Sequence, residues 1–318
     1  YGEAHSSLPV RTWRSTNIMA ATNRLPQVAS AQITYVGDLG VDQWLSLVDS
    51  SANSNNPCVA GAEAAKTATN AYSGAVQATG SSRTVTVPQS TLLLDSNTYA
   101  VCYAAGNGST TDTTWRDSYV RLKISKMESI SAHSVTHKTN GQIARVGGSY
   151  QDWDGNAYQT VQVTDLDLTY AGSLAQQKWV SLVDQTFNSD QPCDSGSVAA
   201  GSAASAYSGV LAAPSSSSVV TVDTLGMSTT LTFAVCYAET NGTSTDNTWA
   251  DSGIRLTVSK VTSIEYGDAH SSLPVRTWRS TNIMAATNRL PQVASAQITY
   301  VGDLGVAEWL SVVDSSAN

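Results

Sequence analysis

The sequence predicts an all-β protein built from tandem antiparallel β-sandwich modules of immunoglobulin-like type, with one disulfide bond in each module. Three observations lead to this prediction: short segments of alternating polar and apolar residues, an internal repeat, and one cysteine pair in each complete repeat. Short alternating segments separated by polar turns are typical of antiparallel sheets. About seven such segments in ~130 residues match the size of a two-sheet sandwich.

The internal repeat defines the modules. Residues 266–318 repeat residues 1–53 with four differences, at an offset of 265 residues. A weaker repeat lies within this period, because "TYAVCYAAGNGSTTDTTW" at 98–115 returns as "TFAVCYAETNGTSTDNTW" at 232–249. Repeats of this kind indicate that each copy is one structural unit. We therefore predict module A at 1–131, module B at 132–265 and a partial module A′ at 266–318.

Alternation also gives the expected strands. They lie at 31–37, 44–50, 83–88, 98–104 and 118–125 in module A, and at 165–172 for the first counterpart in module B. The polar segment between the last two strands of module A is expected to be a hairpin loop. The alanine-rich segment 59–78 contains two glycines and many threonines, so we expect a loop with room for a short helix. The cysteine and tyrosine positions differ from those of antibodies, so the prediction is the sandwich class without the antibody topology.

The four cysteines occupy matched positions. Cys58 and Cys193 each follow a proline in a polar segment, and Cys102 and Cys236 lie within the repeated "AVCYA". Four buried free thiols are the alternative, but the matched pairs and the absence of CxxC spacing favour the bonds Cys58–Cys102 and Cys193–Cys236. Disulfide bonds imply an oxidising, extracellular location.

Composition excludes several classes of function. The chain has 17 Lys and Arg against 25 Asp and Glu, a net charge of −8, and its basic residues form no cluster. This disfavours nucleic acid and anionic membrane surfaces as partners, and no apolar run reaches the ~18 residues of a membrane-spanning helix. Neither a Gly-x-Ser-x-Gly nor an HExxH motif occurs, so we predict no catalytic residue, no enzymatic activity and no cofactor.

Two segments share part of the spacing of a metal site. His133 and His137 are four residues apart, but their segment is expected to be extended, so hydrogen-bonded or solvated histidines are favoured over metal ligands. The segment "DWDGN" at 152–156 begins like a calcium loop, but Val163 stands where such a loop needs a glutamate. An Asp-Gly turn is the favoured interpretation, and we predict no metal site.

Two modification sites and three interface residues are also predicted. Asn107 in "NGS" and Asn241 in "NGT" are acceptors for N-glycosylation at equivalent positions of the hairpin loop. Trp13 and Trp278 occupy one repeat position, and with Trp153 they lie where modules A and B differ most. We predict that these three tryptophans contact a neighbouring module or chain.

A resemblance to a known family follows from two motifs. "YAVCYA…W-x-D-S-x-x-R-L" and "W-x-S-L-V-D…N-x-x-x-P-C" resemble the immunoglobulin-like units of very long extracellular proteins of microbial eukaryotes, such as algal surface fibrils and mastigoneme-type hairs. The resemblance covers both complete modules and the partial third. It implies a glycosylated extracellular filament formed by self-association, and it transfers no catalytic residue. The alternative is an adhesin or carbohydrate-binding surface module, for which Trp153 is the candidate contact.

Overall fold

The computed structural model describes residues 23–29, 31–88, 92–133, 135–146, 166–266, 275–278, 292 and 298–313. Most of these residues lie in β-strands or in the turns between them, and the helices among them are single turns. The protein is therefore mainly β, in agreement with the predicted fold class.

The first group of strands spans residues 24–125. It has a five-stranded sheet of order β1-β7-β6-β3-β4 and a separate pair of β2 with β5. The edge strand β1 runs parallel to β7, and the other pairs are antiparallel. The strands are β1 (Arg24–Pro26), β2 (Gln32–Thr34), β3 (Trp44–Asp49), β4 (Val76–Gln77), β5 (Thr84–Thr86), β6 (Thr98–Ala104) and β7 (Arg116–Ser125).

The second group spans residues 127–258 and repeats this arrangement in a fuller form. One sheet has the order β10-β16-β15-β12-β13, with β10 parallel to β16, and the other has the order β14-β11-β8-β9. The strands are β8 (Met127–Ala132), β9 (Val135–His137), β10 (Asn140–Ile143), β11 (Leu166–Gly172), β12 (Trp179–Asp184), β13 (Tyr207–Ala212), β14 (Val219–Val222), β15 (Thr232–Ala238) and β16 (Ala250–Val258).

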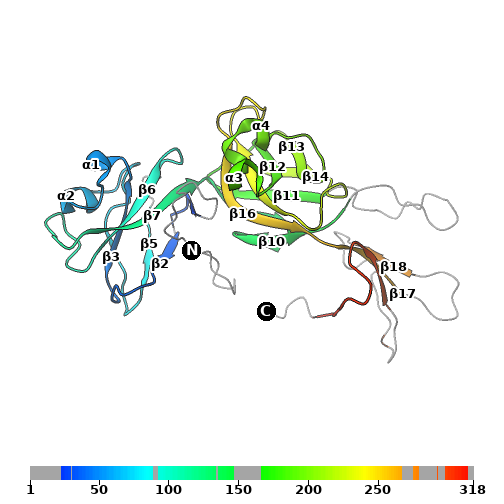
Figure 1. The fold of residues 1–318 in the computed structure, drawn as a ribbon, viewed down its shortest axis with the longest axis horizontal. Coiled ribbons are helices and arrows are strands. Elements are labelled where there is room, and N and C mark those ends of the chain that lie inside the picture. The colour runs from blue at the N-terminus through cyan, green and yellow to red at the C-terminus, as the bar shows by residue number, and fades with distance from the viewer. Residues whose placement is uncertain are drawn as a thin grey trace.

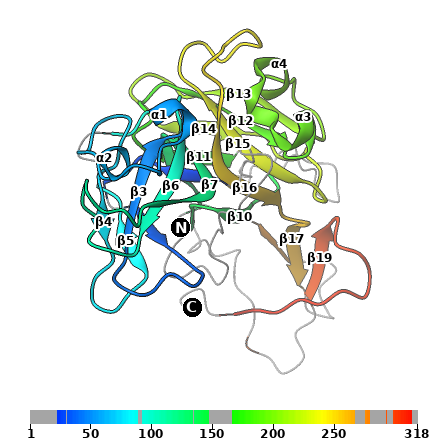
Figure 2. The ribbon, with the colours of Figure 1, turned by 60° about the vertical axis from the view of Figure 1, so that its left-hand side comes forward.

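A third sheet follows in the chain. It contains β17 (Val261–Tyr266) between β18 (Val275–Trp278) and β19 (Ile298–Gly302). Figure 1 shows the three groups one after another along the long axis of the molecule, with β17 and β18 beyond the second group. Figure 2 shows β17 and β19 side by side below β10 and β16. The end of one group therefore meets the start of the next.

The two sheets of the second group share one apolar core. Six fully buried residues show this, because they belong to a single cluster. One sheet contributes Ile130, Leu168 and Val220, and the other contributes Leu182, Val235 and Leu256. Residues of β12 and β15 that face away from this core, such as Val183 and Ala234, form a second buried cluster with Cys193 and Trp249. Burial on both faces explains why "FAVCYA" is apolar without interruption.

Each of the first two groups has a buried cluster on the outer face of its five-stranded sheet. A short helical segment covers this cluster, and the disulfide bond of the group lies within it. In the first group the segment holds α1 (Ala52–Asn55) and α2 (Gly61–Ala64); in the second it holds α3 (Phe187–Asp190), η1 (Pro192–Asp194) and α4 (Gly196–Ala199). The bonds join Cys58 to Cys102 and Cys193 to Cys236, the predicted pairs, with Cα atoms 5.3 Å apart in both. Each bond ties a helical segment to the outer face of a sheet.

The pairing of strands moves the predicted boundaries. Met127–Ala132 pairs with β11 of the second group, and Val261–Tyr266 pairs with β19 of the third sheet. The chain therefore changes from one group to the next at Lys126 and Lys260, a few residues before the predicted boundaries at 131 and 265. Strand length also differs from the prediction at 31–37, where β2 covers Gln32–Thr34 alone.

Candidate assembly interface

The connection between the first and second groups is built around Lys126. Its backbone N–H donates to the hydroxyl of the buried Tyr237, with N and O 3.0 Å apart. Its carbonyl accepts from the N–H of Leu174 at 3.0 Å. Its ammonium group lies 2.6 Å from Glu239 and 3.4 Å from Asp95. Lys126 thus joins the two groups. It contacts Asp95 of the first group and Tyr237, Leu174 and Glu239 of the second.

Electrostatics favour the charged form of this lysine. Partial burial on its own lowers the pKa of Lys126, but the carboxylates of Glu239 and Asp95 outweigh it and raise the pKa above its ordinary value. A second ion pair crosses the same connection, with Arg24 of the first group 3.6 Å from Asp194 of the second. The first connection therefore has two sets of opposite charges.

The connection at Lys260 shares part of this backbone geometry. The N–H of Asp303 donates to the carbonyl of Lys260 at 2.7 Å. The hydroxyl of Ser259 bridges to the backbone of Val261, as the hydroxyl of Ser125 bridges to Met127 at the first connection. The serine bridge thus repeats at an offset of 134 residues, whereas the N–H donor to the lysine carbonyl differs by one repeat position, since Asp303 is the counterpart of Ser173 and not of Leu174.

A glycine makes this arrangement possible at both places. Gly172 and Gly302 end the strands β11 and β19 with φ of +129° and +141°. A Cβ atom on either glycine would overlap the carbonyl oxygen of Lys126 or Lys260, respectively. Glycine is required there both by the positive φ and by the close approach of the connecting backbone.

The side chains at the two connections differ in charge. Arg145 and Asp303 form an ion pair at 2.5 Å across the second connection, and the arginine lowers the pKa of Asp303. The equivalent positions at the first connection hold Gln27 and Ser173, and the hydroxyl of Ser173 donates to the amide oxygen of Gln27. Conversely, Glu239 and Asp194 of the second group correspond to Ala105 and Val59 of the first, so the ion pairs of the first connection have no equivalent in those two residues. Each connection therefore has its own ion pairs.

The predicted glycosylation sites lie on two matched rigid loops. Asn107 and Asn241 are exposed, and each side-chain oxygen accepts the backbone N–H two residues later at 3.0 Å. The glycine after each asparagine has φ near +65° and packs against a tryptophan ring, Trp44 or Trp179. The loops therefore hold both acceptor asparagines at the surface in one conformation.

A buried carboxylate fixes each of these loops. Asp246 accepts hydrogen bonds from the backbone N–H groups of Asn241 and Gly242 and from Thr248. Burial raises its pKa, but these hydrogen bonds outweigh burial and lower the pKa to about 2. Asp112 has the same role in the first loop, and the hydrogen bonds from Thr114 lower its pKa. The repeated Asn-Gly sequence therefore has a structural role in forming the turn, in addition to providing a glycosylation acceptor.

The other acids that the repeats share are structural. Asp251 and Arg255 form a buried ion pair at 2.8 Å, and its counterpart joins Asp117 and Arg121 at 2.7 Å. Burial raises the pKa of Asp251, but the guanidinium of Arg255 outweighs it and lowers the pKa. These pairs account for the spacing "D-S-x-x-R", because both residues lie on one strand and the charges neutralise each other.

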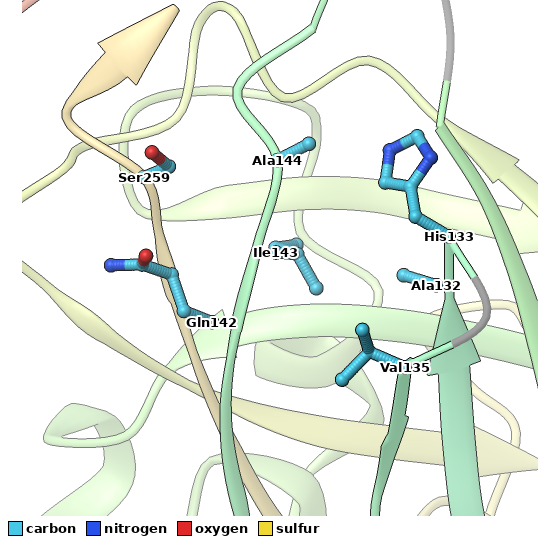
Figure 3. Close-up of a pocket in the computed structure, with 7 residues that line it drawn as sticks. All are labelled: Ala132, His133, Val135, Gln142, Ile143, Ala144 and Ser259. Atoms are coloured by element: carbon cyan, nitrogen blue, oxygen red, sulfur yellow. The ribbon is translucent and has the colours of Figure 1, made fainter. Parts of the chain in front are cut away.

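A shallow cavity of about 130 Å³ lies beside the turn between β8 and β9 (Figure 3). Its walls are the apolar residues Ala132, Val135, Ile143 and Ala144 and the polar residues His133, Gln142 and Ser259. This lining includes no carboxylate or thiol, so it offers no acid–base pair.

Ligand-binding groups are scarce elsewhere in the described ranges. They contain no group of three or more His, Cys, Asp or Glu side chains that could hold a metal ion. His133 occupies a turn and His137 ends β9, so the two do not lie on a helix. The segment 152–156, with Trp153, lies outside the described residues.

The predicted interface tryptophans are placed only in part. Trp13, like Trp153, lies outside the residues that the structure describes. Trp278 belongs to β18, and its backbone pairs with Ser263.

The contacts at Lys126, Arg145 and Tyr237 were not predicted from the sequence. One feature of the sequence could have indicated the ion pair of Arg145: Asp38, Ser173 and Asp303 occupy one repeat position but differ in charge.

No family model matches the chain, and no curated protein matches it either. None of the helices in the described ranges is long and apolar enough to cross a bilayer.

Proposed function

We propose that the protein is a structural subunit of an extracellular, glycosylated filament, in which immunoglobulin-like modules A and B alternate head to tail. The observation that carries the proposal is the repeated connection at Lys126 and Lys260. A regular geometry between successive modules requires similar backbone contacts at each step. At both lysines the carbonyl accepts an N–H from the one or two residues after a matched glycine, and the same serine bridge precedes the next strand. The resemblance of the two sequence motifs to fibril repeats supports the same conclusion.

The immunoglobulin-like interpretation is supported by the order of the strands. Sheets of order β10-β16-β15-β12-β13 and β14-β11-β8-β9, with a parallel edge strand and a shared core, correspond in size and layout to a two-sheet sandwich. The disulfide bond differs from that of antibodies, because it lies on the outer face of one sheet. It gives stability to a small domain without occupying the core.

An extracellular location is supported by cysteine usage, since all four cysteines form disulfide bonds. Glycosylation is supported by the two exposed asparagines on matched loops. Glycans would hydrate the surface of a chain in which only 13% of all residues are charged. We assign the protein no catalytic activity, since the acids shared by the modules serve in turns and in ion pairs.

Electron microscopy of native material tests the filament. We expect long fibres of uniform width whose axial repeat contains two unequal domains. Isolated globules at all concentrations would contradict the proposal.

Mass spectrometry tests the glycans separately. Ser109→Ala and Thr243→Ala remove the acceptor sequence but keep the backbone N–H that holds each asparagine, so they should abolish the glycan mass. Each variant also removes the hydrogen bonds of its own hydroxyl within the loop. Unmodified Asn107 and Asn241 in native material would contradict this part.

A further inference from the structure

The two matched loops each contain Asn-Gly, a sequence that is chemically labile in water. The backbone nitrogen of the glycine can attack the side-chain carbon Cγ of the asparagine. A new C–N bond then closes a succinimide ring, the side-chain nitrogen leaves as ammonia, and water opens the ring to aspartate or isoaspartate. Glycine favours this deamidation because it has no side chain to hinder the attack. Asn107 and Asn241 are therefore intrinsically prone to lose their amide groups.

The asparagine side chains themselves offer no protection from this reaction. Both asparagines are exposed to water. Oδ1 of Asn107 accepts the backbone N–H of Ser109, and Oδ1 of Asn241 accepts both the N–H and the hydroxyl of Thr243. Hydrogen bonds to a carbonyl oxygen stabilise the negative charge that develops on it during attack. Any protection must therefore act on the attacking nitrogen.

The glycine nitrogen is the atom that the fold withdraws from reaction. The N–H of Gly108 donates to Oδ2 of Asp112 at 2.7 Å, and the N–H of Gly242 donates to Oδ2 of Asp246 at 2.8 Å. Both glycines are buried, although the asparagine before each is exposed. The nitrogen becomes a nucleophile only when its proton leaves, and a carboxylate beside it opposes the formation of a second negative charge.

The carboxylate does not promote the reaction as a base. Burial raises the pKa of Asp246, but its hydrogen bonds outweigh burial and lower the pKa to about 2, which makes it too weak a base to take the proton of an amide. The rings of Trp44 and Trp179 pack against the two glycines where a Cβ atom would lie. This packing limits the movement of each glycine toward its asparagine.

We propose that Asp112 and Asp246 protect Asn107 and Asn241 from deamidation by binding the N–H of the glycine that follows each asparagine. The two carboxylates thus preserve the chemical identity of the asparagines in addition to the shape of the turns. This protection depends neither on the filament nor on a bound glycan. It has a consequence for glycosylation, because an aspartate at either position could not carry an N-linked glycan.

Comparison of the folded and unfolded chain is the first test. The full chain, produced without N-glycosylation, is incubated at mildly alkaline pH, either native or unfolded by reduction in urea. Peptide mass spectrometry follows the conversion of each asparagine to aspartate and isoaspartate. Conversion of Asn107 and Asn241 should be at least roughly tenfold slower in the native chain, because the charge-assisted hydrogen bond must break before each attack. Equal rates in the two states would overturn the proposal.

Removing one carboxylate separates its effect from that of folding in general. Asp246→Ala leaves the N–H of Gly242 without this acceptor, so conversion of Asn241 should become roughly tenfold faster in the native chain. Asn107 lies in the other module and should keep its rate. An unchanged rate at Asn241, or an equal rise at Asn107, would overturn the role of the carboxylate.

Thr248→Val is the matched control for a loosened loop. The hydroxyl of Thr248 donates to Asp246 and accepts the N–H of Glu239. Valine has nearly the same shape, so this variant removes hydrogen bonds from the loop but leaves Asp246 on the N–H of Gly242. Conversion of Asn241 should rise much less than in Asp246→Ala. An equal rise in the two variants would assign the protection to the rigidity of the loop and overturn the proposal.

Discussion

Replacing Tyr237 with phenylalanine should loosen the connection at Lys126. Tyr237 is fully buried, and its hydroxyl accepts the N–H of Lys126 at 3.0 Å. The substitution removes this acceptor and leaves a donor at the connection without it, which costs about 1–3 kcal/mol. For a domain of this size such a loss lowers the melting temperature by roughly 3–9 °C. The shape of the side chain is otherwise unchanged, so no cavity adds to the cost.

Tyr103 provides the matched control for this prediction. It is the counterpart of Tyr237 in the repeated "AVCYA", it is half-buried, and its hydroxyl contacts no connecting lysine in the described part of the chain. Tyr103→Phe should therefore change stability by less than about 0.5 kcal/mol. The assay is calorimetric unfolding of the full chain, together with hydrogen exchange of residues 126–132. Equal losses for both variants, with no faster exchange at 126–132, would refute the reasoning.

Tyr237 should also make the folding stability depend on pH in the alkaline range. Burial raises the pKa of Tyr237 to about 12, whereas an unfolded tyrosine titrates near ~10. Between these values the unfolded chain has released the proton and the folded chain has not, so stability falls as pH rises from 10 to 12. Below pH 10 the contribution is fully present. The loss between pH 10 and 12 should be smaller in Tyr237→Phe than in the unmodified protein.

Three further predictions concern the modules themselves. Replacing Cys58 and Cys102 together with alanine should destabilise the first module by about 4 kcal/mol in the chain-entropy model, measured by urea unfolding; an unchanged midpoint would count against it. Gly242→Ala should cost about 1–3 kcal/mol, because the residue has φ of +65° and a Cβ atom would overlap Trp179; unaltered exchange of the loop would contradict this. The pKa of Asp246 is lowered to about 2, so the stability it confers is present above pH 3.9 and is lost as pH falls toward 2, which acid unfolding monitored by tryptophan fluorescence should show.

The sequence predicts the repeated features of the fold well, for a physical reason. A segment such as "AVCYA" is buried on both faces of a strand, so its apolar character is visible without knowledge of its neighbours. The disulfide pairs follow from matched positions, since a bond present in one module is expected in its copy. Both inferences use information that is local in the chain or repeated in it.

Features that depend on a partner distant in the sequence escape this reasoning. Residues 31–37 and 165–172 alternate equally well, but β2 covers three residues and β11 covers seven, because β11 pairs with β8 along a second edge. Lys126 and Arg145 are single charged residues outside any charged motif, and such residues in a sequence look like solvated surface. Their roles emerge when the connection brings Glu239 and Asp303 to them.

The difference between the two connections has a consequence for the order of modules. Joining two A modules would place Gln27 against an aspartate such as Asp38, and the ion pair of Arg145 would be lost. Joining two B modules would place Arg145 against Ser173, with the same loss. Surface ion pairs contribute little free energy individually, but specificity depends on the difference between correct and incorrect partners. Since the glycine approach and the serine bridge recur at both connections, side-chain charge is the property that can favour alternation over repetition of a single type.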